Sequence, residues 1–185
     1  SFFATAADSL HTHNITSYGY DQRGFGRSAN VGSWAGTQTY VDDLRTVVSL
    51  IKDKHPGVPL IVFGESMGGG VVLSSFAPTL GGSGLTVNGI ILSVPAVWGR
   101  EVMPAYQSAV LWVAAHTVPS LTMTGRGLNI QASDNIEMLR AWSRDPLVIK
   151  ETRVDVIWGV VDLMDHALEG ARSFDVRSLV LYGDH

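Results

Sequence analysis

Apolar residues in this chain fall into short runs separated by stretches with helical spacing. Strands are predicted at residues 15–20, 60–63, 87–94 and 179–182, and the last three of these runs lack regular polar alternation. Helices are predicted between and around them, at residues 2–10, 39–55, 68–77 and 154–171. Strands of this kind separated by helices indicate a mostly parallel sheet with helices on both faces. The predicted fold class is therefore α/β.

The helix over residues 39–55 has the clearest signals at its two ends. Thr39 with Asp42 three residues later resembles a capping box, so the helix is predicted to begin there. Lys52 and Lys54 suit the negative end of the helix dipole, and Pro56 follows directly.

The pattern changes after Pro95, because residues 96–153 show only helical segments and loops. One helix is predicted at 105–117, and a shorter one is predicted to be capped by Asp134. A helical insertion rich in Trp and Met is typical of a lid over an apolar pocket, whereas any one Trp taken alone is more often a residue that packs the insertion onto the sheet. The predicted domains are a core, residues 1–95 and 154–185, and a cap, residues 96–153.

The stretch Gly64-Glu65-Ser66-Met67-Gly68 lies between a predicted strand and a predicted helix. A serine in this context is typical of a nucleophile elbow, a strained turn that exposes the serine hydroxyl. The helix that follows would direct the Met67 backbone N–H at an oxyanion formed on an acyl group attacked by Ser66. The alternative is a glycine-rich turn with a structural role only.

Two other patterns imitate binding sites. Gly24, Gly26 and Ala29 partly match a dinucleotide fingerprint, but a loop follows them where that fold needs a helix. His11 and His13 lie in or beside a predicted loop with no third ligand nearby, so we interpret them as solvated rather than metal-binding. No cofactor and no metal are predicted.

Composition narrows the function class. The chain has 185 residues, 45% of them hydrophobic, with a formal net charge of −4 and 13 scattered Lys and Arg, which argues against nucleic-acid binding. No apolar run is long enough to span a bilayer, and no signal segment is seen. A cytoplasmic or peripheral membrane location is therefore expected. The chain opens without Met in a predicted helix and stops just after a predicted strand, which suggests a fragment lacking both ends.

The stretches Tyr20-Asp21-Gln22-Arg23-Gly24-Phe25-Gly26-Arg27-Ser28 and Gly64-Glu65-Ser66-Met67-Gly68-Gly69 resemble the α/β-hydrolase superfamily. The chain is most similar to its branch of bacterial lysophospholipases and monoacylglycerol lipases, grouped with serine aminopeptidases of the S33 type. The stretches 93–100 and 133–147 resemble the cap of that branch. The resemblance implies an α/β-hydrolase fold with a helical cap insertion.

The resemblance also implies roles for particular residues. It makes Ser66 the nucleophile and the Met67 N–H an oxyanion donor, while the His-Gly pair that supplies the second donor is absent. It places the triad acid and base outside the 185 residues, with Asp184 as a weaker alternative for the acid. The six histidines are His11, His13, His55, His116, His166 and His185, and none is expected to be the base.

The expected function is a serine hydrolase that cleaves carboxylic esters of lipid-like substrates, such as a monoacylglycerol or a lysophospholipid. The expected partners are this acyl ester and, through the cap, a membrane surface. An S33-type aminopeptidase and a non-catalytic binding module remain alternatives. The 185-residue piece alone is expected to be poorly soluble or inactive.

Overall fold

A three-stranded parallel sheet forms the centre of the computed structural model, which describes residues 3–124 and 135–183. The strands are β1 (Ile61–Glu65), β2 (Gly89–Ser93) and β5 (Ser178–Leu181), in the order β1-β2-β5. Ile61 pairs with Gly89, and Ile90 pairs with Ser178. The predicted parallel sheet is confirmed, and each strand overlaps the range expected for it.

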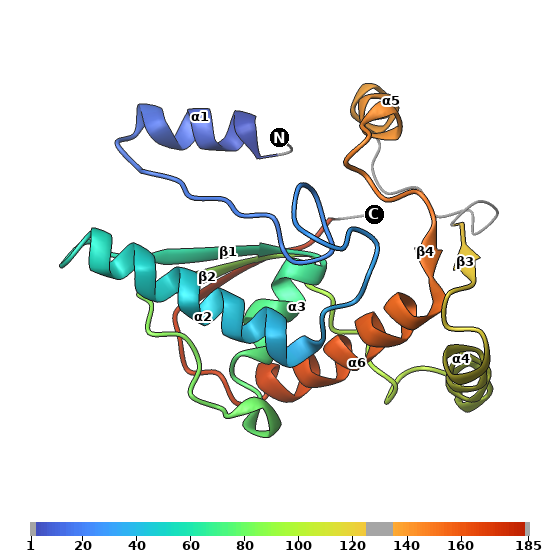
Figure 1. The fold of residues 1–185 in the computed structure, drawn as a ribbon. Helices are drawn as coiled ribbons and strands as arrows, with labels where there is room; N and C mark the ends of the chain where they lie inside the picture. The colour runs from blue at the N-terminus through green and yellow to red at the C-terminus, as the bar shows by residue number, and fades with distance from the viewer. Residues whose placement is uncertain (1–2, 125–134, 184–185) are drawn as a thin grey trace.

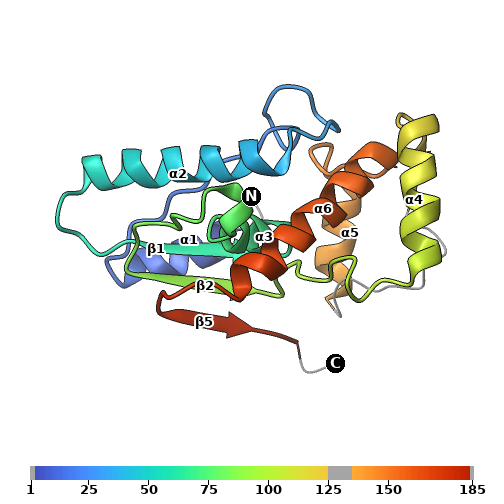
Figure 2. The same ribbon diagram turned by 90° about the horizontal axis from the view of Figure 1, so that it is seen from below.

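Helices lie on both sides of this sheet. The helices α2 (Thr37–Lys54), α3 (Met67–Ser74) and α6 (Val154–Ala171) lie on one face, and α1 (Ala4–Thr12) lies on the other (Figures 1 and 2). The α/β class and the two-sided arrangement predicted from the sequence are therefore confirmed.

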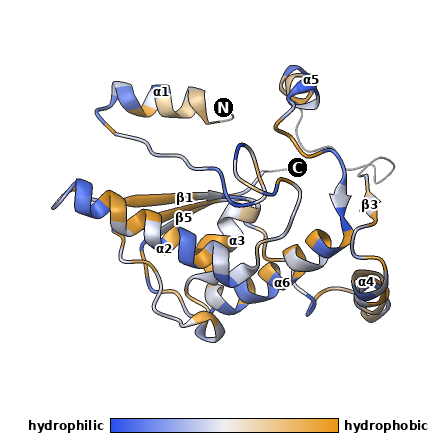
Figure 3. Cartoon of the chain, in the orientation of Figure 1, coloured by the Kyte–Doolittle hydropathy of each residue, from blue (hydrophilic) through white to orange (hydrophobic). Residues whose placement is uncertain are grey.

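The hydrophobic core lies between the sheet and the helices α2, α3 and α6. Its most deeply buried members include Tyr40, Val71, Ile90, Leu92 and Leu163. Burying each such aliphatic side chain contributes about 1.5–3 kcal/mol to folding. The opposite face is less well covered, and Figure 3 shows hydrophobic residues along β1, which lies below α1. The rings of Phe3 and Phe63 meet edge to face.

The predicted strand at residues 15–20 is wrong. This segment has no regular structure, and within the described chain its residues 16–20 take part in no backbone–backbone hydrogen bond. A strand exists only when a neighbour accepts and donates its ladder bonds, and a run of suitable residues does not supply that neighbour. The segment is held by side chains instead, with the Tyr18 hydroxyl 2.6 Å from His55 Nε2.

Helix ends also differ from the sequence-based expectations. Helix α2 begins at Thr37 after Gly36, whose φ of 96° favours glycine, so Thr39 lies inside the first turn and is not the cap. Helix α3 ends at Ser74, before Pro78, which opens the short 3₁₀ helix η1 (Pro78–Leu80). Both ends are set by local backbone geometry that residue type alone does not fix.

The segment 96–153 contains α4 (Ala105–Thr117) and α5 (Ile136–Arg144). Helix α5 is capped by Asn135, whose side chain accepts from the Met138 N–H at 3.0 Å, whereas the expected cap Asp134 lies outside the described residues. The expectation of helices and loops only is wrong, because β3 (Thr122–Met123) pairs antiparallel with β4 (Thr152–Arg153). The described parts of this segment lie beyond the carboxyl ends of the sheet strands (Figure 1).

Helices α4 and α5 contain no buried residue in the described chain. None of the described helices combines the length and the apolar character that crossing a membrane requires.

Candidate active site

Ser66 lies at the turn between β1 and α3, where the chain reverses from strand to helix. Its φ of 48° and ψ of −116° are outside the regions that non-glycine residues ordinarily adopt, and its side chain is exposed. Within the described residues its hydroxyl makes no hydrogen bond. An exposed, unengaged hydroxyl on a strained turn is the geometry of a nucleophile elbow.

The segment after β2 holds the backbone of Ser66 at both ends. The Ser66 N–H donates to the Ser93 carbonyl at 2.9 Å, and the Ser66 carbonyl accepts from the Ala96 N–H at 2.9 Å. We call residues 93–96 the bracket. The bracket fixes the position of Ser66 relative to the sheet.

Three glycines around the elbow, Gly64, Gly69 and Gly70, leave no room for a side chain. A Cβ on Gly64 would lie 2.7 Å from the Gly68 carbonyl oxygen, and one on Gly69 would lie 2.8 Å from Pro95 Cβ. A Cβ on Gly70 would lie 3.0 Å from the Ala96 carbonyl oxygen. Gly68, in contrast, would meet nothing within 4 Å among the described residues. The motif glycine before Ser66 is therefore needed for space, while the one after it is not.

Met67 is the first residue of α3, so its N–H is one of the groups at a helix N-terminus that have no partner within the helix. Such groups carry partial positive charge and stabilise a neighbouring anion. The N–H adjoins Ser66 in the chain, which is where an oxyanion on a bound acyl group would form.

Glu65 is a feature of the site that sequence reasoning missed. It is the last residue of β1 and adjoins Ser66, and desolvation by burial raises the pKa of its carboxyl above the usual value. The signal in the sequence was its place inside the pentapeptide. Its partial burial comes from packing between separate segments and could not be inferred from that place.

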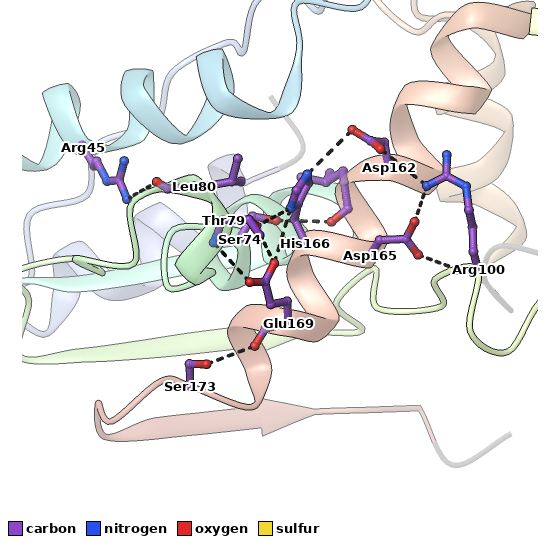
Figure 4. Close-up of polar contacts among 11 residues, drawn as sticks. Arg45, Ser74, Thr79, Leu80, Arg100, Asp162, Asp165, His166, Glu169 and Ser173 are labelled. Carbon is purple, nitrogen blue, oxygen red and sulfur yellow. Dashed lines mark hydrogen bonds and ion pairs between the residues drawn. The ribbon is translucent and has the colours of Figure 1, made fainter.

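None of the described histidines bonds to Ser66. His13 Nδ1 lies 3.0 Å from the Ser9 carbonyl oxygen, and His116 Nδ1 lies 2.7 Å from the Trp112 carbonyl oxygen. On the exposed side of α6, His166 Nδ1 lies 3.0 Å from the Thr79 hydroxyl (Figure 4). Asp184 and His185 lie outside the described residues. In the described part of the chain, no group of three His, Asp or Glu residues is arranged to hold a metal ion.

The loop after residue 20 is held against α2. Arg23 forms a bidentate ion pair with Asp43, at 2.6 and 3.0 Å, and the Tyr40 hydroxyl donates to the Arg23 carbonyl at 3.1 Å. The Asp21 carboxylate accepts from the Arg27 N–H at 2.9 Å, which closes the turn around Gly26. These bonds hold the loop, which is the Asp-x-Arg-Gly-x-Gly-x-Ser stretch, in one conformation against α2.

A pocket of about 330 Å³ lies between this loop and the segment 96–153. Gly24, Phe25 and Ser33 line one side, and Trp142, Leu147 and Ile149 line the other. The described lining is mainly apolar in residue type and does not include Ser66. The pocket is a candidate space for an apolar ligand, separate from the elbow itself.

Arg100 ties the beginning of the segment 96–153 to α6. Its guanidinium forms ion pairs with Asp165 and, at 3.4 Å, with Asp162 (Figure 4). It also lies 4.0 Å from the centre of the Trp158 ring. The Asp165 carboxylate also accepts from the Arg100 backbone N–H. Charge-assisted bonds combined with stacking on an aromatic ring restrain a guanidinium more than either contact alone.

Comparison with known proteins agrees with this geometry. The family described as serine aminopeptidase, S33, matches residues 1–185. A monoacylglycerol lipase of Mycolicibacterium smegmatis is 28% identical over 169 residues, which cover 90% of this chain and 59% of the relative. The chain therefore spans less than two thirds of that relative.

Solved structures show the same fold. The monoacylglycerol lipase of Paleococcus ferrophilus superimposes with a TM-score of 0.74 at 19% identity, covering 98% of this chain and 67% of that one. A soluble variant of the monoglyceride lipase of Saccharomyces cerevisiae, in complex with a substrate analog, gives 0.67 at 21% identity, covering 96% and 61%. With the elbow geometry and the match over all 185 residues, the chain belongs to the serine aminopeptidase S33 family and has the α/β-hydrolase fold.

Proposed function

We propose that the protein is a serine hydrolase that cleaves carboxylic esters of lipid-like substrates, a monoacylglycerol or a lysophospholipid, through an acyl-enzyme on Ser66. The observation that carries the proposal is the exposed Ser66 hydroxyl on a turn where Ser66 has a positive φ, with both backbone groups of the residue held by the bracket. The family membership and the lipase relative support it.

In the proposed reaction, Ser66 Oγ attacks the ester carbonyl carbon while its proton passes to a histidine base. The Met67 N–H donates to the oxyanion of the tetrahedral intermediate. The C–O bond to the alcohol breaks, and the alcohol leaves with the proton returned by the histidine. Water then attacks the acyl-enzyme in the same way and releases the carboxylic acid and free Ser66.

We propose that the base and the acid of the triad lie outside residues 1–185. None of the hydrogen bonds of the described histidines involves Ser66, which supports this placement. We retain Asp184 as the weaker alternative for the acid. The 96–153 segment is proposed to act as a cap, and its position beyond the carboxyl ends of the strands supports that role (Figure 2).

A peptidase acting at a substrate N-terminus is the second candidate, because the matching family is described as serine aminopeptidase. Such an enzyme needs carboxylates that bind a free α-amine, whereas a lipid ester needs an apolar pocket. Trp142, Leu147 and Ile149 along the described pocket favour the ester. Comparing turnover of p-nitrophenyl esters with that of aminoacyl p-nitroanilides separates the two.

The main test is Ser66→Ala in the full-length protein. Loss of the nucleophile should lower kcat for p-nitrophenyl butyrate by roughly six orders of magnitude, because no other group forms the acyl-enzyme. Circular dichroism and thermal unfolding serve as controls for the fold. Retention of a tenth of the activity would show that Ser66 is not the nucleophile.

We also propose that the cap contacts lipid surfaces. Trp98, Tyr106, Val110 and Trp112 are each more than half exposed, at 59%, 68%, 66% and 52%. Exposed aromatic and aliphatic side chains of this kind enter the boundary between headgroups and acyl chains. Sedimentation with phosphatidylcholine vesicles should bring down the full-length protein and much less of a Trp98→Ser, Trp112→Ser variant. Equal sedimentation of both would refute the contact.

A further inference from the structure

Four non-glycine residues in the described chain have a positive φ: Asn14 at 58°, Asn30 at 56°, Ser66 at 48° and Val94 at 42°. Asparagine tolerates this conformation, so the two Asn residues are ordinary turn residues. A β-branched residue does not tolerate it, because both γ-methyl groups crowd the backbone. Ser66 and Val94 are thus the two strained positions.

The two strained residues meet at one place. Val94 is inside the bracket, directly after Ser93, whose carbonyl accepts from the Ser66 N–H, and two residues before Ala96, whose N–H donates to the Ser66 carbonyl. The Val94 N–H donates to the Leu181 carbonyl at 2.8 Å. Val94 therefore lies beside Ser66 at the carboxyl end of β2, and its N–H bonds to the last residue of β5.

The fold gives no reason for valine at this position. Glycine adopts a positive φ without strain, and a turn alone would be served better by it. Pro95 adds to the strain, because the residue before a proline is restricted toward extended backbone. Nor does Val94 fill the core, since 53% of it is exposed. The side chain is kept in a strained, exposed position next to a reactive serine.

Strained backbone that is retained at a functional site points to a role for the residue held there. We propose that Val94 determines substrate specificity. Its isopropyl group forms a wall of the space above Ser66 and limits the bulk of the acyl group next to the ester carbonyl. Linear acyl chains pass this wall, and chains branched at the carbon next to the carbonyl are excluded. This inference rests on the proposed ester hydrolysis.

The test uses the full-length protein and two substrates, p-nitrophenyl butyrate and p-nitrophenyl pivalate, which differ in branching next to the carbonyl. Val94→Gly removes the wall and should raise the ratio of kcat/KM for pivalate over butyrate by about tenfold, the effect expected from a methyl-sized clash in a pocket. The same variant should have a higher Tm, because glycine relieves the strain.

Two matched variants separate a wall from a structural role. Val94→Thr keeps the shape and the backbone strain and should leave the pivalate-to-butyrate ratio unchanged. Asn14→Gly changes a positive-φ residue at the end of α1 and should also leave the ratio unchanged. If circular dichroism shows that Val94→Gly is unfolded, Val94→Ala replaces it, with the same expected direction.

The outcomes are distinct. An unchanged ratio in folded Val94→Gly or Val94→Ala, with wild type active on butyrate, would overturn the role of Val94 and leave the proposed function standing. A ratio that rises equally in Asn14→Gly would also overturn it. A wild-type protein inactive on every ester would reject the proposed function and this inference together.

Discussion

At the scale of single residues, the elbow depends on how little space surrounds its glycines. The strand residue Gly64 abuts the backbone of Gly68 and Gly69, and Gly69 and Gly70 abut the bracket. Backbone atoms cannot yield as a flexible side chain can. The same short stretch therefore contains positions that differ sharply in their tolerance of a single methyl group.

Gly64→Ala is expected to lower the free energy of unfolding by about 1–3 kcal/mol, the usual effect of forcing a methyl group into filled space. The matched control is Gly68→Ala, which meets nothing within 4 Å and replaces glycine inside a helix. It should leave stability unchanged or raise it by up to about 1 kcal/mol. Urea unfolding of the full-length variants measures both. Equal losses would contradict the assigned packing.

The sequence predicted the turn at Ser66, where β1 ends and α3 begins. The pentapeptide around Ser66 is a local signal, because strand, turn and helix are contiguous in the chain. The strain at Val94 and the desolvation of Glu65 were not predicted, since both arise where segments far apart in the sequence meet. Residue type at those two positions carried no sign of either.

At the scale of elements, α6 links η1 and the beginning of the 96–153 segment. Glu169 accepts hydrogen bonds from the Thr79 hydroxyl and, at 3.1 Å, from the Thr79 backbone N–H, and His166 Nδ1 lies 3.6 Å from its carboxylate (Figure 4). One turn or more earlier, Asp162 and Asp165 hold Arg100. Helix α6 thereby fixes two segments that precede it by about 65 to 90 residues.

The contacts of Glu169 predict a pH dependence. The hydrogen bond from the Thr79 hydroxyl is the main reason that the pKa of the Glu169 carboxyl is below its usual value. A carboxyl group whose pKa is lower in the folded state than in the unfolded state stabilises the folded protein at pH values above its unfolded-state pKa. This stabilisation is lost as the pH falls through the folded-state pKa. Stability should therefore fall as the pH is lowered below about 4.5.

Glu169→Gln tests this in the full-length protein. The variant should be less stable than wild type at pH 6. The difference in the free energy of unfolding between the two proteins should shrink as the pH approaches 2, where the wild-type carboxyl is also neutral. Urea midpoints across the pH series give the result. Thr46→Val, at an exposed position on α2, serves as a control, and its difference in stability from wild type should not depend on pH. A stability difference between Glu169→Gln and wild type that stays constant across the pH series would contradict the lowered pKa of the Glu169 carboxyl.

Elements differed in how far the sequence determined them. The range 154–171 matches α6 and the range 105–117 matches α4, because helical bonds form within the segment itself. The segment 15–20 did not become a strand, since a strand depends on a neighbour that the segment's own residues do not specify. The β3–β4 pair was not predicted, because two residues in each strand are too few to show the alternation of polar and apolar residues that is typical of a strand.

At the scale of the whole molecule, apolar residues are exposed along both outer strands of the sheet. Ile61 and Phe63 in β1 are 50% and 46% exposed, and Leu179 in β5 is 52% exposed. Uncovered apolar strands at sheet edges promote association between chains.

Residues 1–185 produced alone are therefore expected to aggregate or to show no ester turnover. Size-exclusion chromatography and the p-nitrophenyl butyrate assay, run beside the full-length protein, measure both properties. A soluble monomer with the turnover of the full-length protein would contradict this expectation and would show that a base lies within these residues.

Active-site titration tests the central claim most directly. The full-length protein is treated with a fluorophosphonate, and the label is counted by intact mass and located by peptide mapping. An activated Ser66 predicts one label per chain, on Ser66, and none in Ser66→Ala, because a phosphonate modifies only a serine whose proton is taken by a base. A full-length protein that stays unlabelled, or that is labelled at another residue, would contradict the account.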